Sequence, residues 1–164
     1  MRYAKPQFNW AVGMKIMLWV ALALLVLFVV VMAYRVSSTP ASDAFGKGLA
    51  ITACGSKPNC VASLAGPAAR SAAAFTFADE LSVAQQRLKR ALLSEPRASI
   101  VNEQPGYIAV TFRSALFGFP DDAEFYLDAA SLEVRFRSAA RIGYSDMGVN
   151  AKRIERLRAQ FALN

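Results

Sequence analysis

The sequence predicts an α+β protein with one N-terminal transmembrane helix, followed by a small domain with a mainly antiparallel sheet and two helices. Three observations predict this fold. A long run near the N-terminus, Ile16 to Tyr34, contains no charged residue, proline or glycine. Segments between residues 99 and 138 alternate apolar and polar side chains, as half-buried strands do. Two further segments, one before and one after these strands, repeat apolar residues at helical spacing.

The apolar run has the length of a membrane-spanning helix. Its 19 residues would form a helix of about 28 Å, close to the hydrocarbon thickness of roughly 30 Å. A buried helix of a soluble domain would carry polar residues on one side, and this run carries none. Trp10 and Tyr34 lie near its two ends, and amphipathic rings favour membrane interfaces. The lipid bilayer is therefore an expected partner, contacted through Ile16 to Tyr34.

Basic residues flank the run unequally. Three precede it and two follow it, namely Arg2, Lys5 and Lys15 before and Arg35 and Lys47 after. The positive-inside bias therefore favours a cytoplasmic N-terminus and a C-terminal domain on the opposite side of the membrane. A cleaved signal peptide is the alternative, although its apolar region normally spans only about 7–15 residues.

The net charge of +7 does not indicate nucleic-acid binding. Residues 1–42 contain four basic and no acidic side chains, whereas residues 43–164 contain 15 basic and 12 acidic ones. More than half of the excess therefore belongs to the segment around the apolar run, and the domain is only mildly basic. The chain has no histidine, which removes the usual general base and the Ser-His and Cys-His nucleophile pairs. No cofactor, metal site or nucleic-acid partner is expected.

The sequence divides into three regions. Residues 1–35 are predicted to be a cytoplasmic lead-in and transmembrane helix, residues 36–53 a linker, and residues 54–164 an extramembrane domain. The linker is rich in Ser, Thr, Pro, Gly and other small residues. Cys54 and Cys60 flank a Pro-Asn turn, and in an oxidising compartment they most simply form a disulfide. Two free thiols are the alternative if the domain faces the cytoplasm.

Two helices are predicted in the domain. Ser82 and Gln85 have the spacing of a capping box, so the first helix is expected over Val83–Leu93. Asn150 can cap the second helix, which is expected from Ala151 to about Ala162. Both helices have an apolar stripe and should pack on one face of the sheet.

A sheet of four or five strands is predicted between and beside these helices. Gln104-Pro105-Gly106 forms a turn by composition. The strands are expected at Phe75–Phe77, Ser99–Asn102, Tyr107–Arg113, Ala123–Leu127 and Leu132–Ser138.

The register of the last hairpin can be argued from burial. A four-residue loop from Asp128 to Ser131 pairs Leu127 with Leu132, and apolar residues then share one face. On the opposite face this register pairs residues of complementary charge. The predicted pairs are Glu124 with Arg135 and Asp122 with Arg137.

Two long motifs resemble a known family. They read Arg113-Ser-Ala-Leu-Phe-Gly-Phe-Pro-Asp-Asp-Ala-Glu-Phe125 and Arg137-Ser-Ala-Ala-Arg-Ile-Gly-Tyr-Ser-Asp-Met-Gly-Val-Asn150. With the stretch from Cys54 to Val61, they are similar to the family catalogued as domain of unknown function 1499 (DUF1499), over about residues 54–160. The resemblance implies a bacterial or plastid envelope protein and implies no reaction. The expected location is the bacterial inner membrane, with a single span and a periplasmic C-terminal domain.

The second motif is the densest run of polar groups in the chain. Guanidinium groups bind phosphate and carboxylate bidentately, so arginines near strand ends could converge on a small anionic ligand. The alternative is a structural Arg–Asp network that holds the loop to the sheet. The candidate binding residues are Arg113, Arg137, Arg141, Tyr144, Asp146 and Asn150.

Two other groups of residues are candidates for function. Asp121 and Asp146 are weak candidates for catalytic acid–base groups, since the neighbouring carboxylates are expected to pair with arginines across the hairpin. Phe117 and Phe119 could contact a partner or the lipid surface. The more ordinary expectation is that one or both rings fold back into the core.

These observations favour a membrane-anchored periplasmic protein that acts as a non-enzymatic binding or interaction module. Its possible partners are a membrane protein and a small anionic ligand. One alternative is an envelope hydrolase that acts on an anionic substrate through Asp and Arg residues. Another is a structural accessory subunit of a membrane complex.

Overall fold

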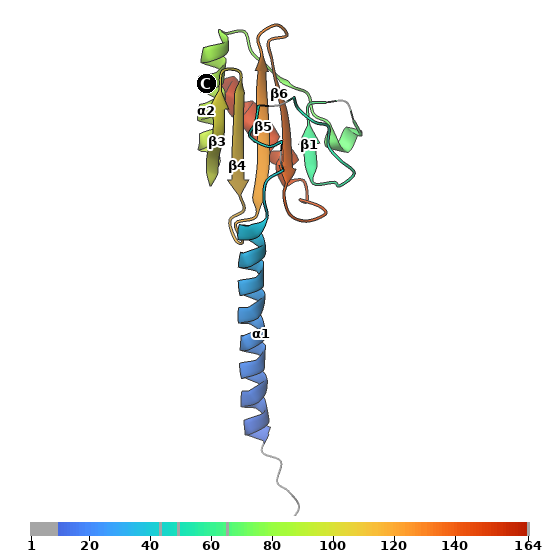
Figure 1. Cartoon of the computed structure of the whole chain (residues 1–164), viewed down its shortest axis with the longest axis vertical. Coiled ribbons are helices and arrows are strands. Elements are labelled where there is room, and N and C mark those ends of the chain that lie inside the picture. Colours follow the sequence, from blue (N-terminus) through green and yellow to red (C-terminus); the bar gives the residue numbers. More distant parts are fainter. Residues whose placement is uncertain (1–9, 43, 49, 65, 164) are drawn as a thin grey trace, which may run out of the picture. The chain divides into compact units, whose positions relative to one another are not determined.

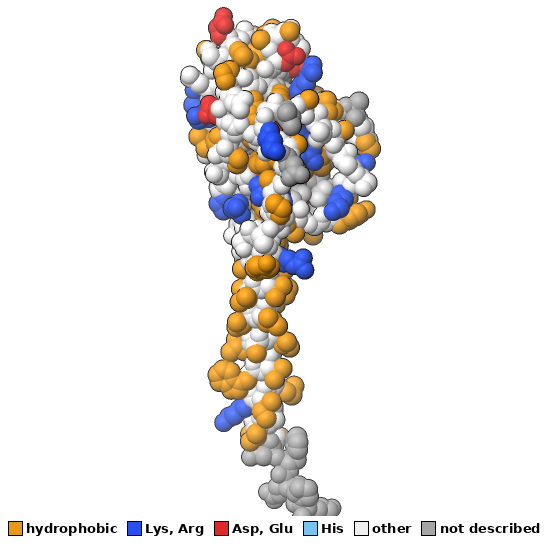
Figure 2. Space-filling view, in the orientation of Figure 1, with side chains coloured by type: hydrophobic (Ala, Val, Ile, Leu, Met, Phe, Trp, Pro, Cys, Tyr) orange, Lys and Arg blue, Asp and Glu red, His pale blue; other side chains and the backbone are white. Residues whose placement is uncertain are grey.

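The chain divides into two compact units, residues 1–38 and residues 39–164. The computed structural model describes residues 10–42, 44–48, 50–64 and 66–163. In the first unit, α1 (Trp10–Ser38) is one continuous helix with no buried residue, and hydrophobic side chains lie along its length (Figure 2). It contains the predicted apolar run and is long and apolar enough to cross a membrane.

The second unit contains a six-stranded sheet with antiparallel pairing between its strands (Figure 1). The strand order is β1-β6-β5-β4-β3, and β2 also pairs with β6. The predicted α+β class is therefore confirmed, with one strand more than the four or five expected. The strands are β1 (Cys60–Ala62), β2 (Phe75–Thr76), β3 (Ala98–Gln104), β4 (Tyr107–Arg113), β5 (Pro120–Asp128) and β6 (Glu133–Ala140).

Two helices, α2 (Leu81–Ser94) and α3 (Val149–Leu163), pack on one face of this sheet, as predicted (Figure 1). A short 3-10 helix, Ala68–Arg70, follows β1. Alternate residues of the central strands meet the apolar stripes of the helices in one core, because side chains alternate between the faces of a strand. The strand residues of this core include Ile108, Val110, Phe112, Ala123, Phe125, Leu127, Val134 and Phe136.

The predicted N-cap of α2 is wrong. Glu80 occupies the capping position in place of Ser82, and no side-chain capping bond forms there. Gln85 bonds to the turn between β3 and β4 instead of completing a capping box. Its Nε2 donates to the carbonyl of Gln104 at 2.9 Å, and its Oε1 accepts from the amide of Gly106 at 2.7 Å. A tertiary contact with the turn therefore replaces the local capping bond that the sequence predicts for Gln85.

The predicted register of the β5–β6 hairpin is wrong by two residues. Leu127 pairs with Val134, and Glu124 lies opposite Arg137. Leu132 lies in the turn, with a φ of 55° and an exposed side chain. A shift by two residues leaves every side chain on its predicted face, so hydrophobic alternation does not distinguish the two registers.

The charge pairs assigned with that register are also wrong. Arg135 contacts Glu133 on its own strand rather than Glu124. Arg137 does not lie opposite Asp122, and Asp122 pairs with Arg141 instead. The polar face of the hairpin must therefore be read from the structure and not from the predicted pairing.

The described residues between 39 and 48 lie on the sheet face that the helices leave free. Asn102 Nδ2 donates to the carbonyl of Gly46 at 2.6 Å, and the amide of Gly46 donates to Glu124 Oε1 at 3.2 Å. Arg141 Nη1 reaches the carbonyl of Thr39 at 3.5 Å. This segment, predicted as a linker, helps to bury polar side chains of the sheet. They include Tyr107, Thr111, Asp122 and Glu124.

Candidate functional site

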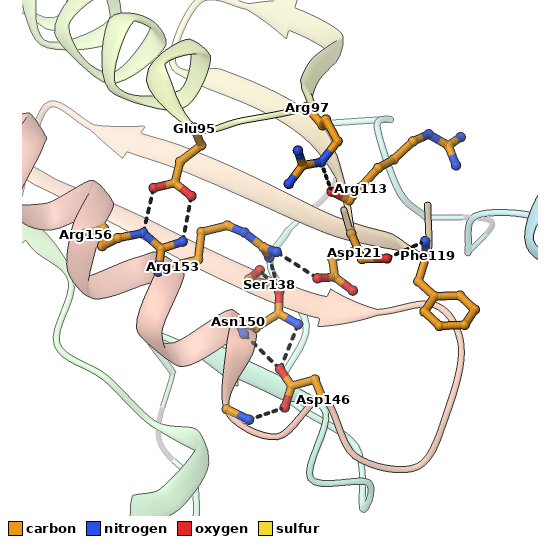
Figure 3. A network of polar contacts seen from close by, with 12 residues as sticks. Glu95, Arg97, Arg113, Phe119, Asp121, Ser138, Asp146, Asn150, Arg153 and Arg156 are labelled. Atoms are coloured by element: carbon orange, nitrogen blue, oxygen red, sulfur yellow. Dashed lines mark hydrogen bonds and ion pairs between the residues drawn. The ribbon is translucent and has the colours of Figure 1, made fainter. Parts of the chain in front are cut away.

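The loop of residues 141–148 joins β6 to α3, and Asp146 anchors its end (Figure 3). Asp146 Oδ2 accepts from the amide of Asn150 at 2.9 Å and from its Nδ2 at 2.8 Å, while Oδ1 accepts from the amide of Gly148 at 3.0 Å. Burial by itself raises the pKa of Asp146, but the hydrogen bonds outweigh it and lower the pKa below its ordinary value. Asp146 therefore caps α3. The predicted cap by Asn150 is wrong, since Asn150 lies inside the helix.

Asn150 is fully buried and ties α3 to the sheet. Its Oδ1 accepts from Ser138 Oγ and, at 2.8 Å, from Arg153 Nη1 (Figure 3). Arg153 Nη2 also pairs with Asp121 at 2.9 Å. Burial raises the pKa of Asp121, while the Arg153 guanidinium opposes this effect. The carboxylate of Asp121 is therefore held in a buried ion pair on the helix side of the sheet.

Arg141 lies on the other face of the sheet and binds Asp122 through two contacts. Its Nε reaches Oδ2 at 2.5 Å, and its Nη2 reaches Oδ1 at 2.7 Å. Nη2 also donates to Thr111 Oγ1 at 3.2 Å, and Nη1 to the carbonyl of Thr39. The ion pair predicted between Asp122 and Arg137 is therefore formed by Arg141 instead. This guanidinium ties the loop, the sheet and the residue that follows α1 together.

The side chain of Arg137 forms no hydrogen bond or ion pair with another residue in the described ranges, and its Nε is buried. The carboxylate opposite it, Glu124, accepts instead from the hydroxyl of Tyr107 at 2.6 Å and from the amide of Gly46. A buried donor without an acceptor costs about 1–3 kcal/mol. Such a group requires an explanation other than stability of the fold.

Arg137 and Arg141 line an open pocket of about 300 Å³ together with Asp122. Because Asp122 neutralises Arg141, the pocket keeps the positive charge of Arg137. A phosphate or carboxylate group is small enough for this volume and is the natural partner of a guanidinium. The other lining residues are Pro40, Ala41, Ser42, Ala139 and Ala140.

The predicted disulfide between Cys54 and Cys60 is confirmed, and its loop supports the pocket. Asn59, inside this loop, is buried and donates from Nδ2 to the carbonyls of Ala140 and Gly143, at 3.3 and 3.2 Å. Its own carbonyl accepts from the amide of Ala140 at 2.9 Å. The disulfide loop therefore holds the backbone on both sides of the pocket arginine at position 141.

The structure brings two of the six predicted binding residues, Arg137 and Arg141, into this pocket. Asp146 and Asn150 serve the start of α3. Tyr144 is 72% exposed and does not line the pocket. Arg113 is also exposed, and its Nη1 donates to the carbonyl of Gly118 at 3.1 Å.

Several residues that shape the site were not predicted. Arg153 follows Asn150 by three positions, which places both on one face of a helix, so helical spacing could have identified this pair. Ser138 falls on the core face by strand alternation, where a hydroxyl needs a partner. Asn59 and Thr111 give no such signal, because their partners lie in other segments of the chain, including the loop after β6.

The site offers little for catalysis or metal binding among the described residues. The pocket's Asp122 is bound by Arg141, and Asp121 and Asp146 are both engaged elsewhere. In the described ranges, no group of three or more His, Cys, Asp or Glu side chains could hold a metal ion.

A comparison with protein families matches residues 50–161 to the family described as "Protein of unknown function (DUF1499)". The matched region covers more than half of the chain and contains all six strands of the sheet. A search of curated proteins finds no match.

Proposed function

The chain belongs to the DUF1499 family, and we propose from its structure that it is a membrane-anchored, non-enzymatic binding module that holds a small anionic group at Arg137. The observation that carries the proposal is the buried Nε of Arg137, which has no acceptor among the described residues. An anion in the pocket would supply that acceptor. The proposed function therefore depends on one guanidinium that forms no ion pair among the described residues.

The pocket favours one class of ligand. The Arg141–Asp122 pair is charge-balanced and fixes one wall, while Arg137 supplies the net charge. A guanidinium presents several N–H donors in a plane, a geometry that matches the oxygen atoms of phosphate and carboxylate. The ligand class is a phosphate or carboxylate group.

Binding is favoured over hydrolysis by the state of the carboxylates. A general base must be free to take a proton from the attacking water. Asp122 lines the pocket but accepts from Arg141 and from Thr111 Oγ1, the latter at 2.9 Å. Asp121 and Asp146 do not line it.

The anchor is α1 and the location is the periplasm. A helix with the length and hydropathy of α1 suits a bilayer core. Disulfides persist in oxidising compartments such as the periplasm, which agrees with the Cys54–Cys60 bond. The basic residues before the apolar run support a cytoplasmic N-terminus.

Titration of the full chain in lipid nanodiscs with inorganic phosphate tests the proposal. Charge-assisted hydrogen bonds contribute about 1.5–3 kcal/mol, so Arg137→Gln should weaken phosphate binding by roughly ten- to a hundredfold. Arg135→Gln is the matched control. Arg135 lies on the same strand and the same face, but it contacts Glu133 and does not line the pocket.

Equal affinity in the wild-type and Arg137→Gln proteins would refute the anion site. Equal loss in both arginine variants would also refute it, because the effect would then reflect general charge. A panel with acetate in place of phosphate distinguishes a carboxylate from a phosphate ligand at the same residue.

A further inference from the structure

We propose that the loop of residues 114–119, flanked by Arg97 and Arg113, binds the surface of an anionic lipid bilayer. The proposal rests on the anchoring role of α1 but not on the anion pocket. It concerns the end of the sheet where β4 ends and β5 begins.

The loop has an apolar tip that is held in place. Leu116 is 82% exposed and Phe117 is 44% exposed. The ring of Phe117 packs against that of Phe119, with centroids 5.5 Å apart, and neither ring belongs to the buried core. The expectation that these rings fold back into the core is therefore wrong.

Hydrogen bonds across the base of the loop define its shape. The amide of Ser114 donates to the carbonyl of Phe119 at 3.0 Å, and the amide of Phe119 donates to Ser114 Oγ at 2.9 Å. Arg113 Nη1 donates to the carbonyl of Gly118. An exposed apolar side chain on a fixed loop marks a contact surface more strongly than one on an unconstrained loop, because less conformational entropy is lost on binding.

The charge at this end of the sheet is positive toward solvent. Arg97 and Arg113 are exposed. Among the described residues, Arg97 donates to the carbonyl of Arg113 (Figure 3) and Arg113 to that of Gly118, so neither side chain is bonded to a carboxylate. The nearby carboxylates Asp121 and Asp122 are buried and paired with arginines. Exposed cations beside an apolar tip match an anionic membrane interface, where basic side chains meet headgroups and apolar ones enter the acyl boundary.

A second loop presents similar side chains at the same end of the sheet. The amide of Arg141 donates to the carbonyl of Pro120 at 3.1 Å, so the 141–148 loop leaves the sheet beside the start of β5. In this second loop Tyr144 is 72% and Met147 is 89% exposed. Tyrosine is enriched at membrane interfaces because its ring is apolar and its hydroxyl is polar.

The covalent chain places this end of the sheet within reach of a bilayer. Thr39 directly follows Ser38, so their Cα atoms lie about 3.8 Å apart whatever the orientation of the domain. Ser38 is four residues beyond Tyr34, or about 6 Å of helix, and the headgroup layer is about 5–8 Å thick on each side. The carbonyl of Thr39 is bound by Arg141 at the end of the sheet described above. Lipid is therefore the occupant that the chain itself keeps nearby.

Spin labels on the full chain in nanodiscs test this surface. The native cysteines form a disulfide, so an introduced thiol is labelled selectively. Ala115→Cys reports the loop and keeps both apolar tips, while Ala129→Cys, in the turn at the opposite end of β5, is the control. We expect the label at 115 to collide with oxygen but to be shielded several-fold from a polar nickel reagent. The label at 129 should collide with both.

The same label checks the apolar tip and the charge. Adding Leu116→Ser and Phe117→Ser should restore access of the nickel reagent to position 115. Replacing anionic lipid with zwitterionic lipid should reduce the shielding. Unchanged shielding in the first experiment would overturn the proposed role of Leu116 and Phe117. Unchanged shielding in the second would overturn the proposed role of Arg97 and Arg113.

The remaining outcomes each oppose the proposal and identify what has failed. Equal nickel access at 115 and 129 would exclude lipid contact. Shielding of 115 from both reagents would indicate a protein partner instead. A third label, Leu25→Cys in α1, separates this inference from the anchor. Shielding from nickel at position 25 without shielding at position 115 would contradict only the proposed loop surface. Nickel access at position 25 would also contradict the membrane anchor.

Discussion

Arg137 and Arg141 lie four residues apart and contribute differently to the fold. Arg141 is bound by a carboxylate, a hydroxyl and a backbone carbonyl. Arg137 has a buried Nε and no partner among the described residues. Residues that serve a ligand often lower stability, because their polar groups are satisfied only when the ligand is bound.

This contrast predicts opposite effects of Arg→Met substitutions at the two positions. Arg141→Met removes one partner of a largely buried ion pair and should reduce the free energy of unfolding by about 3 kcal/mol. Arg137→Met removes an unsatisfied donor and should be neutral or stabilising by about 1 kcal/mol. Urea unfolding of the two variants measures both values. A large destabilisation by Arg137→Met would show that Arg137 has a structural partner and would contradict the assignment of the pocket.

At the level of elements, the start of α3 depends on Asp146. The lowered pKa of Asp146 means that its ionised form is favoured in the folded state. Its contribution to stability is therefore fully present above the ordinary value of 3.8 and is lost as the pH falls through the lowered pKa. The pKa shift of Asp121 has the opposite sign. Burial raises this pKa, so folding favours the protonated form of Asp121.

Asp146→Asn should therefore reduce stability in a pH-dependent manner. At neutral pH the loss should be about 1 kcal/mol, the usual value of a helix cap. The difference from the wild-type protein should shrink as the pH falls below 3.8, while Asp121 titrates in both proteins. Chemical denaturation across this pH range provides the measurement. Ser145→Ala, in the same loop, removes a neutral acceptor of the Met147 amide, so its effect should not vary with pH.

At the level of elements, the disulfide loop and the 39–48 segment share one role. Asn59 holds the backbone at Ala140 and Gly143, and Thr39 accepts from Arg141. Both segments precede the first long strand in sequence but bond to residues at or just after the end of the last one. The pocket is therefore assembled from residues 40–42, Asp122 and residues 137–141, which are far apart in sequence, so no single motif contains it.

At the level of the whole molecule, the proposed periplasmic location of the domain makes a prediction for intact cells. In Ala129→Cys, a membrane-impermeant maleimide should label position 129 from the periplasmic side without lysis. Cys54 and Cys60 should react only after reduction, because they form a disulfide. Labelling at 129 only after lysis would place the domain in the cytoplasm. The mass of the purified chain would show whether α1 is retained or removed as a signal sequence.

The sequence alone determined the features that depend on composition and periodicity. The uninterrupted apolar run predicted α1, and alternation predicted which side chains of β4, β5 and β6 face the helices. The spacing of Cys54 and Cys60 predicted the disulfide, and the motifs identified the family. These features are local, so neighbouring residues contain the necessary information.

Only the tertiary structure decided which polar groups meet. Side chains alternate with a period of two, so a hairpin shifted by two residues buries the same face but changes every cross-strand pair. In the observed register Arg137 lies opposite Glu124 but forms no ion pair with it, and Asp122 pairs with Arg141 from the following loop. The partners of Glu124 come from Tyr107 and from Gly46, 78 residues away in sequence. Pairing between distant segments depends on the folded arrangement of the chain, which is why the candidate site emerged only from the structure.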